Sequence, residues 1–540
     1  MEALNLNGEW TLVHFPEGAY LAASPAELKA LGLPSVSAYV PGNVELDLVR
    51  AGQLPEPFYG DQIRRLRPLE THEWWYIRNF QAPAAGKTPW RLVFEGLDTL
   101  ATVWLNGACL GEANNMLVEQ SFDATVALRP GAENELVVRI GSSLNAARRY
   151  EYDAVALSWE RREEGLHIRK AAHMWGWDIM PRAVSAGIWR PVWLESVAET
   201  AIEQLYFYTI EVTPGQLEPE LGEAEGGAPG AGTLRDAHAL LGVRFQFRTP
   251  ERNLDGFSLR FRGRCVSPET HEFEYEWPVE FVAGGCTIPV PGARLWWPKG
   301  SGEPVLYTVT TDLLYKGKVT ATRTGRVGIR KLVVDRTELS GRPRMVEPSA
   351  AERVRLDTPP DPESHFIFYV NGEPVQVRGT NWVPLDAFHS RDAERLEAAM
   401  ALVDDLGCNM VRCWGGNVYE AERFFDLCDE KGILVWQDFA FACCRYPQTA
   451  EFLERVQEEA ERVVRRLRNH PALAIWCGDN EIDMAYLSEG LSPEHNRITR
   501  VVLPAVLHRL DPFRAFVPSS PYTPPAVFRQ KDPWRATPEQ

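Results

Sequence analysis

Strand-like apolar runs alternate with amphipathic helical segments along the last third of this 540-residue chain. The runs begin near Val375, Met410, Ile433, Leu473 and Ala515. Between them lie segments with the helical spacing of apolar residues, at 390–406, 418–431 and 448–468. In the first segment Gly407 follows as a stop, and one face carries Leu396, Met400, Val403 and Leu406. This alternation predicts a parallel sheet covered by helices.

Polar and aromatic residues stand where four of these strands end. The strand ends are Thr380-Asn381-Trp382, Arg412-Cys413-Trp414-Gly415-Gly416, Trp436-Gln437-Asp438-Phe439 and Asp479-Asn480-Glu481. In a β/α barrel the catalytic groups lie at the carboxyl ends of the strands. Trp offers a flat apolar face to a pyranose ring, and amides and carboxylates bind its hydroxyls. Any one of these Trp residues is more simply explained as core, but their repetition at neighbouring strand ends favours a sugar pocket.

The fourth strand end carries the candidate catalytic group. Residues 472–476 form a short apolar run of the buried-strand type, which ends in Gly478-Asp479-Asn480-Glu481. A carboxyl that follows an amide and lies near a Trp has the parts of a general acid, because apolar neighbours favour its neutral, proton-donating form. The simpler interpretation of this segment alone is a loop with incidental polar residues. The other strand ends are what favour the catalytic interpretation.

Composition excludes several classes of partner. The net charge of -17 argues against nucleic acid and against an anionic membrane surface. Residues 1–8 lack the basic and apolar regions of a secretory signal, and no apolar stretch is long enough to span a membrane. The nine cysteines are odd in number, and the chain has neither a Cys-x-x-Cys pair nor a His-Glu-x-x-His motif. We therefore expect reduced thiols, a cytoplasmic location, no zinc site and no cofactor.

The residues before the alternating region have all-β patterns. Segments 90–95, 101–105 and 135–140 are strand-like, and Asn106-Gly107 is a strong turn signal. Further β patterns lie at 239–248 and 306–314, with a Gly-rich stretch at 222–232 that we expect to be a loop. A Pro- and charge-rich stretch at 340–363 then leads into the barrel. The sequence thus predicts three domains, at residues 1–198, 199–340 and 341–540.

The third predicted domain is short for a barrel. An eight-stranded barrel needs about 250 residues, whereas residues 365–540 supply far fewer and contain five predicted strands. The segment 533–540 offers no closing strand or helix. We therefore expect an incomplete (β/α)8 barrel, truncated on its C-terminal side, with an open parallel edge.

Together these motifs resemble glycoside hydrolase family 2, specifically its β-mannosidase branch, over nearly the whole chain. Segments 92–98 and 103–107 are similar to the family's N-terminal jelly-roll domain, and 170–193 looks like the segment that closes it. The middle region looks like the family's immunoglobulin-like sandwich, which ends near 328–331. The four strand ends match barrel strands one to four. The resemblance implies a multidomain protein with a jelly-roll β-sandwich, an immunoglobulin-like β-sandwich and a TIM barrel.

The resemblance also implies a retaining mechanism with two carboxyls about 5–5.5 Å apart. Glu481 matches the acid/base. The family's nucleophile, a Glu on the seventh strand, would lie beyond Gln540, so we expect the fragment to be inactive alone. Asn480 would bind the sugar 2-hydroxyl and Arg412 would orient the nucleophile. The remaining implied substrate-binding residues are Asp178, Trp177, Asn381, Trp382, Trp414 and Asp438.

Two departures from the family pattern are visible. The family's Gly-Trp-Asp-Trp-Gly-Pro reads Gly176-Trp177-Asp178-Ile179-Met180-Pro181 here, which alters a predicted wall of the pocket. The Gly-Asn-Asn-Glu often found at the acid/base reads Gly478-Asp479-Asn480-Glu481, which places a further carboxylate beside the predicted acid.

The leading hypothesis is an exo-β-mannosidase that hydrolyses terminal, non-reducing β-D-mannose of oligosaccharides or glycoconjugate glycans. Galactosidase- and glucuronidase-like members carry His-Tyr-Pro where this chain has Trp414-Gly415-Gly416, which favours the mannosidase branch. Exo-β-glucosaminidase or another family 2 glycosidase remains an alternative. So does a non-catalytic carbohydrate-binding fragment, since β-sandwich domains often bind sugars without chemistry. The sequence leaves the oligomeric state and the linkage preference open.

Overall fold

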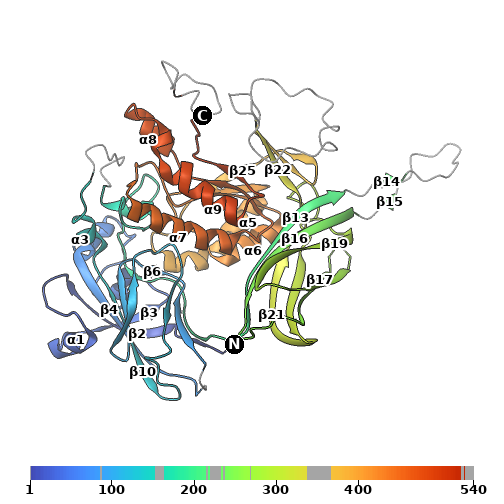
Figure 1. Ribbon diagram of the computed structural model, residues 1–540. Coiled ribbons are helices and arrows are strands. Elements are labelled where there is room, and N and C mark those ends of the chain that lie inside the picture. The colour runs from blue at the N-terminus through green and yellow to red at the C-terminus, as the bar shows by residue number, and fades with distance from the viewer. Residues whose placement is uncertain are drawn as a thin grey trace.

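The computed structural model describes residues 2–84, 88–152, 163–213, 217–218, 233–234, 237–267, 269–336, 366–523 and 528. The expected loop at 222–232, the stretch at 340–363 and the segment 533–540 lie outside the described residues. Figure 1 shows three parts: a blue β-sandwich, a green β-sandwich, and an orange-to-red α/β part that contacts both. No helix in the described ranges is long and apolar enough to cross a membrane.

The first part is a sandwich of two antiparallel sheets. One sheet has the order β3(Val36–Val40), β2(Gly8–Pro16), β4(His72–Gln81), β10(Glu133–Ile140), β7(Ala101–Leu105), β8(Ala108–Ala113). The other has the order β1(Ala3–Asn5), β12(Val192–Ser196), β5(Trp90–Phe94), β9(Gln120–Asp123). The remaining elements are β6(Leu97–Asp98), β11(Gly187–Ile188), α1(Pro25–Leu31), α2(Val44–Arg50) and α3(Ser143–Ala147). The three predicted strands are confirmed, and so is the turn after β7, where Asn106 and Gly107 have φ of 53° and 82°.

The second part is a smaller sandwich. Its sheets have the orders β13(Ala201–Thr213), β16(Ala237–Arg248), β19(Ala283–Ala293) and β18(His271–Pro278), β17(Phe257–Cys265), β20(Tyr307–Tyr315), β21(Lys318–Val327). A two-stranded ribbon, β14(Leu217–Glu218) with β15(Thr233–Leu234), extends from it (Figure 1). The alternating residues of β17, among them Leu259 and Phe261, are fully buried between the sheets, as the period of a half-buried strand requires. Both predicted strands of this region are confirmed: β16 contains 239–248, and β20 covers all but the first residue of 306–314.

The third part is a five-stranded parallel sheet covered by helices. Its order is β25(Gly379–Trp382), β26(Met410–Cys413), β27(Leu434–Asp438), β28(Leu473–Cys477), β29(Ala515–Val517). The helices are α5(Asp392–Asp405), α6(Glu422–Lys431), α7(Ala450–Leu467), α8(Ile482–Ser488) and α9(Leu503–Leu510). The predicted alternation is therefore confirmed, with five parallel strands of a β/α barrel that does not close within the described residues.

Two details of the predicted alternation are wrong. The first parallel strand begins at Gly379, because the run near Val375 belongs to the antiparallel sheet β22(Leu332–Arg336), β23(Phe366–Val370), β24(Glu373–Val375). Leu406 does not share the buried face of α5, and it is 75% exposed. It lies after the last helical residue, where the chain turns toward Gly407, whose φ is 70°.

A buried ion pair joins the first sandwich to the barrel helices. Glu459 on α7 accepts hydrogen bonds from Arg169 Nε at 2.8 Å and Arg169 Nη2 at 2.7 Å. It also accepts from Asn115 Nδ2 at 2.8 Å and from the Tyr419 hydroxyl at 3.0 Å. The side chains of Arg169 and Glu459 are 2% and 1% exposed. Because a buried charge is stable only when it is paired and hydrogen-bonded, this cluster fixes how the two parts are packed.

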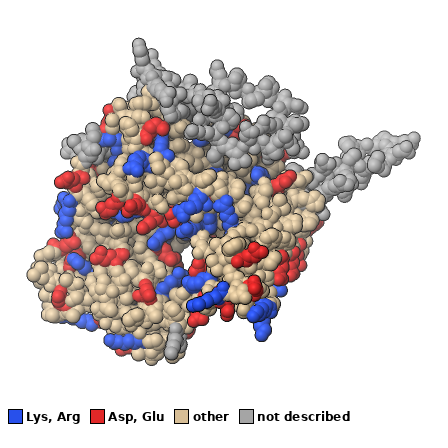
Figure 2. Space-filling view, in the orientation of Figure 1, with Lys and Arg blue, Asp and Glu red and all other residues tan. Residues whose placement is uncertain are grey.

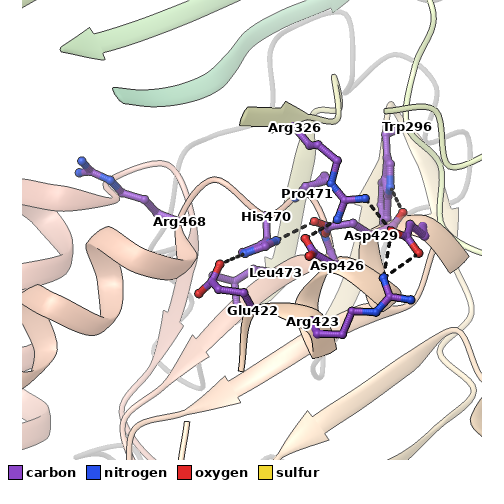
Figure 3. Close-up of polar contacts among 12 residues, drawn as sticks. Trp296, Arg326, Glu422, Arg423, Asp426, Asp429, Arg468, His470, Pro471 and Leu473 are labelled. Atoms are coloured by element: carbon purple, nitrogen blue, oxygen red, sulfur yellow. Dashed lines mark hydrogen bonds and ion pairs between the residues drawn. The ribbon is translucent and has the colours of Figure 1, made fainter. Parts of the chain in front are cut away.

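The second sandwich contacts the barrel through α6 (Figure 3). Arg326 on β21 forms ion pairs with Asp426 and, at 2.7 Å, with Glu430. The Trp296 indole N–H donates to the Asp429 carbonyl oxygen at 2.9 Å. Both sandwiches therefore contact the barrel through buried or half-buried polar groups. Residues of all three parts share one apolar cluster.

Candidate active site

Arg412, at the end of β26, joins the ends of three neighbouring strands. Its Nη2 lies 2.7 Å from Asp438 Oδ2 on β27 and donates to Asn480 Oδ1, beyond β28, at 3.1 Å. Asp438 also accepts from the Trp436 indole N–H at 3.0 Å and from the Gly415 backbone N–H at 3.1 Å. Burial opposes the charge on Arg412, but the Asp438 carboxylate holds its pKa above the usual value. The guanidinium is thus a fixed cation at the strand ends.

Asn480 and Glu481 follow β28 in an irregular backbone. The Asn480 N–H donates to the Phe441 carbonyl at 2.9 Å, and its own carbonyl accepts from the Cys443 N–H at 2.7 Å. Glu481 and Cys443 have φ of 61° and 53°, a left-handed conformation that is uncommon for side chains of this size. Such strain persists where surrounding contacts over-determine it, and it clusters at functional sites.

The Cys443 side chain connects these two residues. Its thiol donates to Glu481 Oε2 at 3.2 Å and accepts from Asn480 Nδ2 at 3.2 Å. Burial, with the nearby Glu481 charge, raises the pKa of the thiol well above its ordinary range, so that it remains an S–H donor at neutral pH. Arg412, Asn480, Cys443 and Glu481 therefore form one continuous hydrogen-bonded chain, and Glu481 at its end is only half-buried.

Asp479, the carboxylate that departs from the family pattern, faces the start of α8. Its Oδ1 accepts from the Ile482 N–H at 3.1 Å and from the Ser519 hydroxyl at 2.5 Å, which satisfies a free amide at the helix start. Burial, followed by the nearby Asp483 charge, raises the pKa of Asp479 well above its usual value. This carboxyl supports the turn that presents Glu481.

The first sandwich supplies an aromatic wall next to this hydrogen-bonded chain of side chains. Trp177 packs edge-to-face on Trp414 with ring centroids 5.1 Å apart, and it packs against the apolar cluster that Trp414 forms with Ala442 and Cys443. The loop that carries Trp177 is held by the His173 N–H, which donates to the Gly416 carbonyl at 3.0 Å. Asp178, the next residue after Trp177, is exposed. Tryptophans from two parts of the molecule thus meet beside the half-buried Glu481.

Three further predicted substrate-binding residues, Trp382, Asp438 and Asn381, lie at or near the same strand ends with contacts of their own. Trp382 packs on Phe424 of α6 and donates its indole N–H to Glu420 at 3.0 Å, so these contacts turn its ring toward the helices, and its role in the pocket stays a prediction. Asp438 is 1% exposed and its oxygens accept from Arg412, Trp436 and Gly415, so it positions Arg412, and its contact with a sugar stays a prediction. Asn381 is the register partner of Arg412 and is exposed at the open edge of the sheet.

Sequence reasoning missed a buried histidine pair under the Trp177 loop. His173 Nε2 lies 2.7 Å from His389 Nε2, and His389 Nδ1 lies 2.7 Å from Asp392 Oδ2. Burial, with the neighbouring His389, lowers the pKa of His173 well below its usual value. Neither histidine stands in a recognisable motif, and only the approach of the first sandwich to α5 brings them together.

Asp426, Asp429 and His470 could in principle hold a metal ion, since their ligand atoms lie within 4.8 Å of one another. Their ligand atoms are already engaged (Figure 3). Asp426 pairs with Arg326, and Asp429 accepts from the Ala472 N–H at 2.9 Å and lies 2.6 Å from His470 Nδ1. Because the cation Arg326 and the imidazole occupy these oxygens, we interpret the group as an interdomain ion-pair network. The expectation of no metal and no cofactor stays a prediction.

Three family models match the chain in the order in which its parts lie. Residues 23–190 match the glycosyl hydrolase 2 galactose-binding domain-like model, residues 260–330 match the glycosyl hydrolases family 2 model, and residues 364–502 match the family 2 TIM barrel domain. The chain belongs to glycoside hydrolase family 2. The three-part architecture of this family is the one predicted from the strand and helix patterns.

Named relatives place this family 2 chain in the β-mannosidase branch. It is 32% identical over 464 residues to β-mannosidase B of Thermothelomyces thermophilus, a match that covers 84% of the chain and 48% of that relative. It is 31% identical over 507 residues to β-mannosidase B of Aspergillus terreus, which covers 90% of the chain and 54% of that relative. The chain thus spans about half the length of these relatives.

Solved structures of other glycosidases share this fold. A β-D-mannosidase from Dictyoglomus thermophilum superimposes with a TM-score of 0.76 at 31% identity, and the match covers 99% of the chain and 59% of that structure. A Bacteroides uniformis β-glucuronidase superimposes with a TM-score of 0.61 at 17% identity, covering 95% of the chain and 52% of that structure, and supports the fold alone.

Proposed function

We propose that this family 2 protein is a retaining exo-β-mannosidase, which hydrolyses terminal β-D-mannose at the non-reducing end of oligosaccharides or glycoconjugate glycans. The observation that carries the proposal is the hydrogen-bonded chain from Arg412 through Asn480 and Cys443 to Glu481, beside the Trp177–Trp414 pair. The relatives with about 30% identity are β-mannosidases, which supports mannose as the sugar.

Glu481 would act first as general acid and then as general base. It would protonate the glycosidic oxygen of the leaving group, and later take a proton from the water that attacks the glycosyl-enzyme. The half-buried position of Glu481 and its left-handed backbone support a role in contact with substrate. The nucleophile of double displacement would come from a barrel strand other than the five described.

The remaining groups would bind and orient the sugar. Asn480 would hydrogen-bond the 2-hydroxyl, and its side chain is held for this between Arg412 and Cys443. Trp177 and Trp414 would form an apolar wall for the pyranose ring, and the exposed Asp178 beside them would bind sugar hydroxyls and restrict the pocket to chain ends. We also propose the domain limits 1–198, 199–340 and 341–540, and a cytoplasmic location, with which nine free cysteines agree.

Direct binding tests the sugar assignment on the chain as it exists. Titration calorimetry with methyl β-D-mannoside, methyl β-D-glucosaminide and methyl β-D-galactoside should show a preference for the mannoside of about tenfold or more, equal to about 1.4 kcal/mol. Asn480→Ala should abolish that preference, whereas Asn5→Ala, at an exposed position of β1 in the first sandwich, should leave the ratio of affinities unchanged. Equal affinity for all three glycosides would contradict the assignment.

Turnover separates the enzyme from a binding protein. A version with a complete barrel should release β-mannose from p-nitrophenyl β-D-mannoside with retained configuration, which proton NMR of the first-formed anomer detects. Mannoside binding without any turnover in that version would favour a non-catalytic carbohydrate-binding protein. Faster turnover of the β-glucosaminide would favour the exo-β-glucosaminidase alternative.

A further inference from the structure

A cavity lies between the second sandwich and the barrel, away from the strand ends that carry Glu481. Its volume is about 90 Å³. The wall combines Tyr206 and Tyr208 of β13, Arg330 from the segment after β21, Arg468 at the end of α7, and Arg514 just before β29. One water molecule needs only about one water-sized sphere of such space. A cavity of this volume therefore has room for a tetrahedral ion of five heavy atoms.

The charges that line this cavity are unbalanced. Among its described lining residues the acidic side chain is Asp511, against the three guanidinium groups, Lys331 and His470. His470 is paired with Asp429 and Glu422, and Lys331 donates to the Ile210 carbonyl oxygen. Asp511 is already engaged, because it pairs with Arg514 and accepts from the Tyr206 hydroxyl at 2.5 Å and the Trp476 indole N–H at 2.8 Å. Asp511 therefore compensates Arg514.

Arg330 and Arg468 have neutral partners instead. Arg330 donates to the carbonyls of Pro471 at 2.7 Å and Leu473 at 2.6 Å. Arg468 donates to the Leu510 carbonyl at 2.8 Å and to Gln204 Oε1 at 3.3 Å. In the described part of the chain no carboxylate lies within ion-pair distance of either group, and the buried Nε of Arg468 has no acceptor.

This arrangement disfavours the charged forms of Arg330 and Arg468. Arg468 is 6% exposed, and Arg330 is half-buried. Burial lowers the pKa of Arg330 to about 9, with repulsion from Arg514 as a further cause, and burial lowers the pKa of Arg468 to about 10. Buried charges in proteins are normally paired, so a missing negative partner is the simplest account of two desolvated guanidinium groups at one cavity.

We propose that this cavity binds a small inorganic oxyanion of the size and charge of phosphate or sulfate, held by Arg330 and Arg468. The planar fork of a guanidinium matches two oxygens of such an ion, and a charge-assisted hydrogen bond to the free Arg468 Nε would complete its donors. Figure 2 shows Lys and Arg gathered near the centre of the view, over the ends of α7 and α9 beside the second sandwich. This surface would attract an anion to a protein whose net charge is -17.

The ion would join two parts of the molecule. Arg330 belongs to the strand connection that leaves the second sandwich, and Arg468 and Arg514 belong to the barrel. An anion bound by both sides therefore stabilises their packing, and by mass action it raises the unfolding temperature as its concentration rises above the dissociation constant.

Equilibrium dialysis with radiolabelled phosphate, in Tris chloride buffer, tests the proposal on the wild-type chain. We expect one phosphate per chain, displaced by sulfate and not by chloride at the same ionic strength. Arg468→Gln and Arg330→Gln should each weaken binding about tenfold or more, since each removes one charge-assisted contact. Arg509→Gln is the matched control, because Arg509 is exposed on α9 and pairs with Glu461. It should change the affinity by less than about twofold.

Every result decides the question. No binding by the wild-type chain at phosphate concentrations up to about 10 mM would overturn the proposal. Binding that survives both substitutions, or that falls equally in Arg509→Gln, would show general attraction to the surface and would also overturn it. If the two variants do not fold, wild-type crystals soaked in selenate replace them. An anomalous peak between Arg330 and Arg468 supports the site, and a peak elsewhere or none refutes it.

Discussion

Replacing Glu459 by Gln should lower the free energy of unfolding by about 3–5 kcal/mol, the usual loss when one member of a buried ion pair is removed. The Glu459 side chain is 1% exposed and accepts four hydrogen bonds, two from Arg169 and one each from Asn115 and Tyr419. The amide keeps the shape of the side chain but leaves the Arg169 charge buried without compensation. The remaining acceptor, the Ala440 carbonyl at 3.0 Å, is neutral.

Urea unfolding followed by Trp fluorescence measures the effect. The matched control is Glu461→Gln, two residues along α7, where the side chain is 19% exposed and pairs with Arg509. A pair at the surface contributes about 0–1 kcal/mol, so the control should unfold close to the wild type. The double variant Arg169→Met, Glu459→Leu should recover part of the loss, because apolar residues of similar volume remove the unpaired charge. A loss below about 1 kcal/mol for Glu459→Gln, or equal losses for both single variants, would refute the reasoning.

Three further predictions concern the site and the interdomain contacts. With a complete barrel, Glu481→Gln should nearly abolish hydrolysis of substrates with poor leaving groups and spare the first step for activated aryl mannosides; equal losses on both would argue against the acid/base role. Asp178→Ala should cost roughly 2–4 kcal/mol of transition-state binding, measured as kcat/KM, and an unchanged kcat/KM would leave Asp178 as a surface turn residue. Burial disfavours charge on His470, but Asp429 and Glu422 raise its pKa from 6.5 to about 9. The stability that it contributes is therefore complete below about pH 6.5 and is lost as the pH rises through about 9. In His470→Asn the free energy of unfolding should change less with pH over that range. A wild-type-like pH dependence in the variant would contradict this assignment.

Local patterns were sufficient to predict the architecture. The apolar runs before Arg412 and Asp479 are buried parallel strands, and Gly407 and Gly432 end their helices in the left-handed conformation, with φ of 70° and 69°. These features depend on residues close in sequence, which is why periodicity and turn chemistry can find them. The family resemblance rested on the same segments.

Sequence could not show which face of a strand end meets the pocket. Trp382 and Asp438 lie at the ends of neighbouring strands, yet their side chains have different partners. Trp382 packs on α6, whereas the Asp438 carboxylate accepts hydrogen bonds from Arg412 and two further N–H donors. Side chains alternate between the faces of a strand, so a shift of one residue exchanges inside and outside. Strand register is a property of the assembled sheet, and a single strand does not carry it.

Contacts between distant segments were likewise hidden. Cys443 meets Glu481 across 38 residues and His173 meets His389 across 216 residues. Neither pair has a spacing that marks a motif. The left-handed backbone at Cys443 and Glu481 is also absent from any local signal, because neither residue type favours that conformation.

The division of the pocket between two parts of the chain has a consequence for protein engineering. Trp177 reaches Trp414 from a loop that His173 anchors to Gly416, while Arg169 locks the same sandwich onto α7. A graft of the barrel alone into another scaffold would lose half of the aromatic wall and leave the buried Glu459 carboxylate without its partner Arg169. Recombination between relatives should therefore preserve function only when the first sandwich and the barrel are inherited together from one parent, which makes the pair a single unit of exchange.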